Sequence, residues 1–322
     1  MNRETKQYYN RTIWFAMLSS MDGTHTYKTD FTVSFFLFDP KIIAETSEGF
    51  EKSIAILTLI IGLLGFVGNI VTIFKIVCDK RLHTPTFLAI GCLALPDTLN
   101  IIGIFVRKFS DLFIYVVIQH DYNESMFEFL TFYFLDQTFI SCSTAHIVFL
   151  AMIRYLLIVH PLESKVRLTV PIVMSCSVMI WIYSLLLSAF ILIIIATITE
   201  DSIDRSGKIM YTFSILSILR GWLAICAIII MHIKKVMALN MSSVTNTICL
   251  RMNVIICIIL SVYVFSLIPF MLFTCYSLYV VNTDSLLSFS FVIYMYDICL
   301  IFGIFNFSCN PYVIFWASHI FL

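Results

Sequence analysis

The sequence predicts an all-α fold, a seven-transmembrane helix bundle, and two observations carry that prediction. Of the 322 residues, 60% are hydrophobic and only 12% are charged, and the mean hydropathy is +0.95. Water-soluble domains have roughly a quarter charged residues, so much of the surface of this chain must face lipid. The second observation is that apolar runs of about 20 residues, the length of a helix that crosses a bilayer, recur along the chain.

Seven such runs follow one another with short connections. They cover residues 54–77, 86–106, 127–159, 170–198, 209–233, 250–276 and 286–316. Backbone groups in lipid must be hydrogen-bonded internally, and long runs without alternating polar residues favour helices over a β-barrel. We therefore expect an amino-terminal tail over 1–53, a seven-helix domain over 54–316 and a short carboxyl-terminal segment over 317–322.

Charge and cysteine usage exclude several classes of function. Lys plus Arg and Asp plus Glu both number 20, and this zero formal net charge argues against a nucleic-acid partner. The ten cysteines lie within or at the ends of apolar runs and are interpreted as small buried hydrophobic residues. The chain has no CxxC pair, glycine-rich phosphate loop or GxSxG elbow, so neither an enzyme nor a cofactor is predicted.

The basic residues are distributed unevenly between the two sides of the predicted bundle. One side holds Lys75, Lys80, Arg81, Arg154, Lys165, Arg167, Lys234, Lys235 and Arg251. The other side holds only Arg107, Lys108, Arg205 and Lys208. Basic loops stay in the cytoplasm, so we expect a plasma-membrane protein with its amino terminus outside. The Asn-x-Ser/Thr triplets at Asn10 and Asn123 then both lie outside, where they are candidate glycosylation sites.

Short motifs stand at matching places in the predicted helices. Residues 153–162 read Ile-Arg-Tyr-Leu-Leu-Ile-Val-His-Pro-Leu at the end of the third helix. Further motif residues are Gly68-Asn69, the segment from Leu93 to Asp97, Trp181, Pro269 and Asn310-Pro311. Together they resemble the marker positions of rhodopsin-like (class A) G-protein-coupled receptors, whose third helix ends in DRYxxIxxPL. The resemblance covers residues 54–316, and residues 83–87 are similar to the nematode-type peptide and chemosensory orphan receptors.

The resemblance implies a receptor that binds an extracellular ligand, foremost a neuropeptide, and activates a heterotrimeric G-protein. A chemosensory receptor for small odorants and a non-signalling seven-helix scaffold are alternatives. A transporter is disfavoured, because transporters often contain internal repeats and this chain has an odd number of spans and no repeat.

Asp97 is a candidate site residue because it lies in the middle of the second predicted helix. An ionisable group there is costly unless it faces the bundle interior or a water-filled cavity. By the helix alignment of the family, Ser143, Asn306 and Asn310 surround it and resemble the central sodium and water pocket of these receptors. A hard cation prefers such oxygen ligands around a carboxylate. The alternatives are a hydrogen-bond cluster that only packs helices and a proton relay.

Two further candidate sites follow from the resemblance. Arg154, Tyr155 and Leu162 are expected to contact the G-protein, although Arg154 could instead be an anchor that reaches the membrane surface.

Asp136 lies five helical turns before Arg154, at the depth where amine receptors hold the ligand's ammonium group. Arg220 in the fifth helix is either a second ligand contact or the partner of Asp136. Asp297 gives the outer mouth an acidic character that suits a basic peptide.

The sequence also departs from the family pattern at several positions. Ile153 replaces the carboxylate before the arginine, Ile314 replaces the seventh-helix tyrosine, and Leu267 replaces the sixth-helix tryptophan. Neither cysteine of the usual outer disulfide is present, since Phe129 holds the third-helix position and residues 199–208 contain no Cys. We expect these departures to loosen the restraint on Arg154 and to alter coupling.

Overall fold

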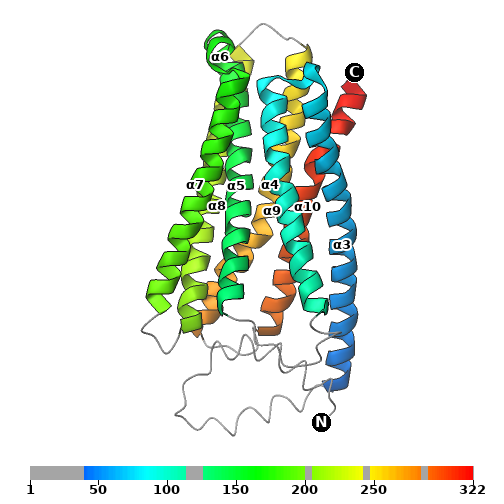
Figure 1. Ribbon diagram of the computed structural model, residues 1–322, viewed down its shortest axis with the longest axis vertical. Coiled ribbons are helices and arrows are strands. Elements are labelled where there is room, and N and C mark those ends of the chain that lie inside the picture. Colours follow the sequence, from blue (N-terminus) through cyan, green and yellow to red (C-terminus); the bar gives the residue numbers. More distant parts are fainter. Residues whose placement is uncertain (1–39, 114–125, 200–204, 242–246, 284–288, 322) are drawn as a thin grey trace.

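The computed structural model describes residues 40–113, 126–199, 205–241, 247–283 and 289–321. Within these ranges the chain is helical and contains no strand. In this described part of the chain, seven long helices run side by side with alternating direction (Figure 1). They are α3 (Pro40–Cys78), α4 (Pro85–Phe113), α5 (Met126–Val159), α7 (Val170–Thr199), α8 (Arg205–Met241), α9 (Thr247–Thr283) and α10 (Phe289–Phe321). The predicted all-α bundle is therefore confirmed.

The structure also describes two short helices at the same end of the bundle, here called the α6 end. They are η1 (Lys80–Leu82), between α3 and α4, and α6 (Pro161–Arg167), after α5. The Asp79 side chain accepts a hydrogen bond of 2.9 Å from the backbone N–H of Arg81 and so starts η1. Pro161 begins α6, where a missing N–H costs nothing because first-turn N–H groups have no helical partner.

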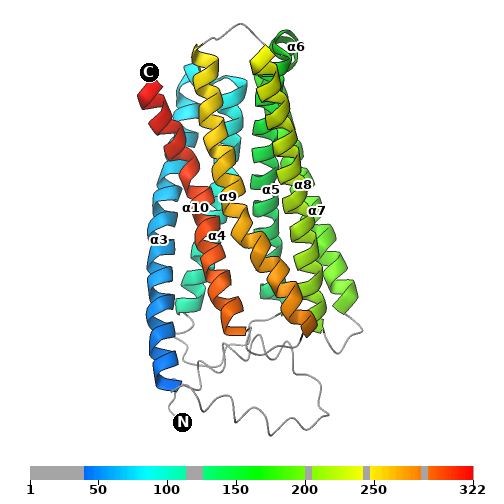
Figure 2. The same ribbon diagram turned by 180° about the vertical axis from the view of Figure 1, so that it is seen from behind.

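The helices enclose α5, which packs against α4, α7, α8, α9 and α6. On the other side of the bundle α10 contacts α3, α4 and α9, as the view from behind shows (Figure 2). The buried core lies mainly between α4 and α5 and includes Ile90, Leu93, Ile147, Leu150 and Ile153.

A close approach of α3 and α10 explains Gly68 of the first-helix motif and also Gly65, which lies one turn before it. A Cβ atom on Gly65 would overlap the Ser308 side chain and lie 2.6 Å from its Cα, and one on Gly68 would lie 3.1 Å from Pro311. The neighbouring Asn69 donates a hydrogen bond of 2.9 Å from Nδ2 to the backbone oxygen of Phe307. Small residues at this interface bring the two backbones together.

The outside of the bundle is apolar. Six helices have described segments long and apolar enough to cross a membrane, and α10 has a shorter apolar segment, Ile298–Val313. Large side chains such as Leu63 and Phe74 on α3 are exposed on the bundle surface. The chain is therefore a multi-pass membrane protein.

Prolines lie inside α4, α9 and α10, at Pro96, Pro269 and Pro311. A proline inside a helix removes one backbone hydrogen bond and favours a bend. Figure 2 shows that α9 changes direction along its length.

Candidate functional site

Asp97 is fully buried in the middle of α4 and is bonded to two other helices. The Ser143 hydroxyl of α5 donates to Oδ1 at 2.6 Å, and Nδ2 of Asn310 on α10 donates to Oδ2 at 2.8 Å. The structure therefore brings together three of the four residues expected in the central pocket.

Asn306, the fourth residue, precedes Asn310 by one helical turn and so lies on the same face of α10. It is buried, and its Oδ1 makes no hydrogen bond to any residue that the structure describes. Its oxygen, the Ser143 hydroxyl and the Asp97 carboxylate are the kinds of ligand that a hard cation prefers. The donor set therefore fits a sodium ion.

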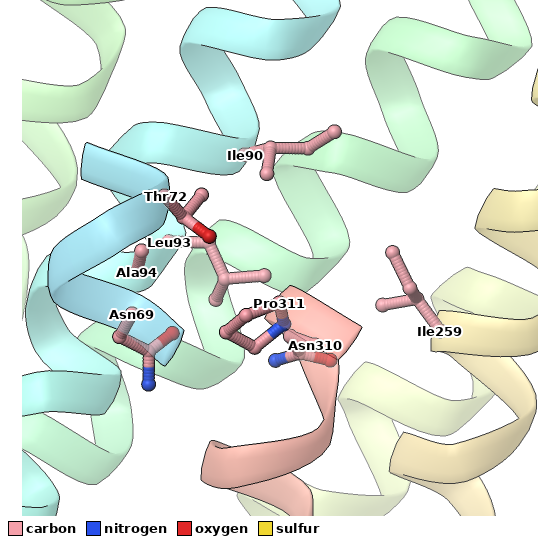
Figure 3. A pocket seen from close by; sticks show the side chains of 8 residues that line it. All are labelled: Asn69, Thr72, Ile90, Leu93, Ala94, Ile259, Asn310 and Pro311. Carbon is pink, nitrogen blue, oxygen red and sulfur yellow. The ribbon is translucent and has the colours of Figure 1, made fainter. Parts of the chain in front are cut away.

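A narrow, mostly apolar pocket lies beside Asn310 of the Asp97 cluster (Figure 3). Its lining comes from α3, α4, α9 and α10 and comprises Asn69, Thr72, Ile90, Leu93, Ala94, Ile259, Asn310 and Pro311. Asn310 belongs both to this lining and to the Asp97 cluster, and Pro311 follows it at the point where α10 can bend.

The second candidate site lies in the half of the bundle that is away from the α6 end. The guanidinium of Arg107, near the far end of α4, forms a salt bridge with the carboxylate of Asp136 on α5. About a third of each side chain is exposed, 38% and 27% respectively.

Arg220 of α8 contacts α5 without reaching Asp136. Its Nη1 donates to Oε1 of Gln137 at 3.0 Å and to the hydroxyl of Ser141 at 2.7 Å. Of the two alternatives for Arg220, the pair with Asp136 is not formed, because Asp136 is paired with Arg107 and Arg220 is hydrogen-bonded to neutral side chains.

Three predicted site residues lie outside what the structure describes. Asn10 and Asn123 belong to undescribed segments, and Asp297 lies on α10 without a described side chain.

At the α6 end the structure places the predicted coupling residues on α5 and α6. Arg154 is buried, with 7% of its surface exposed, and it does not extend into solvent as a surface anchor would. The ring of Tyr155 packs edge-on against His160 at a centroid distance of 6.0 Å. Leu162 is 80% exposed, and Val166, one turn further along α6, is 78% exposed.

Two departures from the family pattern occupy apolar surroundings. Ile153 has no exposed surface and belongs to the core between α4 and α5, and Leu267 packs against the same core. The side chain of Ile314 is outside the described part of α10.

Sequence reasoning missed several polar contacts inside the bundle. Arg107 was counted only among the few basic residues of the outer side, and Gln137 and Ser141 were not singled out although they lie one turn apart on α5. His146 was also missed: it is fully buried, and its Nε2 lies 2.8 Å from the Ser177 hydroxyl of α7. The sequence did contain a signal for these contacts. A polar residue inside an apolar span indicates that its side chain faces the bundle interior and contacts a polar partner there.

Comparison with known proteins adds a family and two relatives. Residues 68–313 match the family model described as 7 transmembrane receptor (rhodopsin family). The chain is similar to trace amine-associated receptor 9 of Mus musculus, with 31% identity over 122 residues that make up 38% of this chain and 34% of that receptor. Its similarity to trace amine-associated receptor 9 of Homo sapiens is 30% over 121 residues, or 38% and 33% of the two chains. The aligned region thus spans about a third of the length of these relatives.

Proposed function

The chain belongs to the rhodopsin family of seven-transmembrane receptors, and we propose that it binds an extracellular ligand and activates a heterotrimeric G-protein at its α6 end. The observation that carries this proposal is the exposed apolar pair Leu162 and Val166 on α6, a helix that packs against α5, which carries the buried Arg154. Residues four apart on a helix lie on one face, so α6 presents these two side chains together. An exposed apolar surface at the polar end of a membrane bundle suits a protein partner.

The basic residues support the proposed direction of signalling. Lys80 and Arg81 in η1 and Lys165 and Arg167 in α6 all lie at the α6 end. Because basic connections remain in the cytoplasm, this end faces the G-protein and the amino terminus lies outside the plasma membrane. An epitope inserted between α8 and α9 is then stained only after permeabilisation, whereas staining of intact cells overturns this orientation.

The ligand site of the proposed receptor lies in the other half of the bundle, around Asp136, Arg220 and Asp297. A neuropeptide is the first candidate, because Arg220 offers a charged group to a polar ligand. A primary amine is the second candidate, since the aligned relatives are named trace amine-associated receptors. The salt bridge to Arg107 favours the peptide, because it already neutralises the carboxylate that an amine needs.

We further propose that the Asp97 cluster holds a sodium ion in the resting receptor. Asp97 supplies the negative charge, Ser143 and Asn306 supply neutral oxygens, and Asn310 orients the carboxylate. A bound ion affects signalling only if the resting and active states bind it with different affinity.

The coupling proposal is tested by a G-protein activation sensor in cells with matched surface expression. Leu162→Asp places a charge in the apolar contact, so it should reduce basal activation at least about tenfold, the size of a lost interface anchor. Glu163→Gln is the matched control, because Glu163 is also exposed on α6 and its only described ion pair, at 4.0 Å from Arg167, is weak. Equal activation by wild type, Leu162→Asp and untransfected cells contradicts the proposal.

A further inference from the structure

We propose that Arg220 binds a carboxylate group of the ligand, so that the receptor recognises an organic acid or a peptide with a free carboxyl terminus. The inference rests on the proposed function and adds the chemical class of the ligand.

Arg220 lies inside the apolar span Ile215–Ala238 of α8. A cation in such a span is costly unless it meets an opposite charge or a water-filled cavity. Its hydrogen bonds to Gln137 and Ser141 satisfy Nη1, but both partners are neutral and leave the charge unbalanced.

Within the described part of the chain, no carboxylate pairs with Arg220. Asp136, next to Gln137 on α5, is held by Arg107, and Asp97 accepts hydrogen bonds from Ser143 and Asn310. Asp136 is paired with Arg107, and the hydrogen-bond partners of Arg220 are neutral, so no described side chain balances the charge of the Arg220 guanidinium. A cationic ligand would be repelled there, and a monovalent anion would be attracted.

The guanidinium also has the geometry that a carboxylate needs. Its remaining nitrogens, Nε and Nη2, form no hydrogen bond to the described residues and present parallel N–H groups. Such a fork binds the two oxygens of a carboxylate bidentately, with shorter and stronger bonds than neutral partners give. The phenols of Tyr133 and Tyr263 lie within electrostatic range of the guanidinium. Their rings suit a ligand with an apolar or aromatic body beside its acid group.

The test uses the purified full chain and thermal unfolding, so it requires no G-protein. The probes are N-acetylphenylalanine and its primary amide, which differ in charge and little in shape. A parallel arm compares pools of pentapeptides with free-acid and amidated carboxyl termini, to distinguish a small acid from a peptide acid. The acid should raise the unfolding midpoint of the wild type in at least one arm, whereas the matching amide should not.

Two variants separate ligand binding from a structural role. Arg220→Gln should weaken acid binding about tenfold or more, and Arg220→Lys should retain part of it as a point charge. Without ligand, Arg220→Gln should unfold at the same or a higher temperature than the wild type, because it removes an unbalanced charge. A large fall in that midpoint would make Arg220 a structural residue and overturn the proposal.

Equal effects of acid and amide on the wild type would also overturn it. Because basal G-protein activation is measured without any ligand, failure of this inference and failure of the coupling proposal give different results.

Discussion

The guanidinium of Arg107 on α4 is ion-paired with the carboxylate of Asp136 on α5. The sequence predicts that Asp136 lies at the depth where amine receptors of this family hold the ammonium group of their ligand. In this chain the Arg107 guanidinium contacts the Asp136 carboxylate, as the ammonium group of an amine ligand would. The salt bridge therefore ties two helices together across the proposed ligand site and changes which ligands the site can accept.

Removing the Arg107 guanidinium should allow the site around Asp136 to bind an amine ligand. Arg107→Ala leaves the Asp136 carboxylate without its described partner, so 2-phenylethylamine should bind about tenfold or more tightly than to the wild type. Ligand-induced thermal stabilisation of the purified chain measures the change. The double variant Arg107→Ala/Asp136→Asn is the control and should lose the gain. A gain that persists in the double variant would mean that the amine binds elsewhere.

The Asp97 cluster should respond to sodium. Compared with choline chloride at equal ionic strength, sodium chloride should raise the free energy of unfolding by about 1 kcal/mol, the value expected when its concentration is several times the dissociation constant. Asp97→Asn keeps the shape of the side chain but removes the charge, so the difference between the salts should vanish. Asp136→Asn should leave that difference intact. If the free energy of unfolding of the wild type is equal in the two salts, the cluster serves only to pack the helices.

The α3–α10 contact should tolerate no added side chain at Gly65. Gly65→Ala forces its new methyl group against Ser308, so it should lower the free energy of unfolding by about 1–3 kcal/mol. Gly303→Ala is the matched control on α10, since nothing lies within 4 Å of its new Cβ. Alanine there should be neutral or stabilising by up to about 1 kcal/mol. Thermal unfolding and surface expression report both effects, and equal behaviour of the two variants would contradict the described approach.

The helices could be predicted from the sequence because each contains an apolar run of about bilayer length. Their ends could not: α3 begins at Pro40 although its apolar run begins at residue 54. Residues 41–53 include good helix formers such as Ala44 and Glu45, so the helix continues beyond the apolar segment.

The Asp97–Ser143–Asn310 contacts were also predictable, because the family resemblance supplies the rotation of each helix. The partners of Arg107 and Arg220 were not. Helix α5, which supplies the partners of both arginines, is apolar on nearly every face, so its hydrophobic pattern does not show which side faces which neighbour. Lys235 illustrates the same limit: it was assigned to a loop, but it is buried, with Nζ at 3.4 Å from Cys257 Sγ.

Ile153 should influence basal activity. Ile153→Asp restores the carboxylate beside Arg154 and should favour the resting state by about 1 kcal/mol, which lowers basal G-protein activation about fivefold. Ile153 is buried in the core, so any polar replacement also loses apolar contacts. Ile153→Asn carries that loss without the charge and is the control at matched surface expression. If both variants signal like the wild type, Arg154 is restrained by other contacts.

The most direct test of G-protein coupling at the α6 end is nucleotide exchange on a purified heterotrimeric G-protein. The receptor is reconstituted in lipid nanodiscs, and wild type is compared with Arg154→Ala at equal receptor concentration. We expect the wild type to accelerate exchange without ligand, and we expect Arg154→Ala to reduce that acceleration at least about tenfold. Wild-type receptor that is folded by its unfolding transition but leaves exchange at the rate of empty nanodiscs, across each G-protein class, would contradict the proposed signalling function.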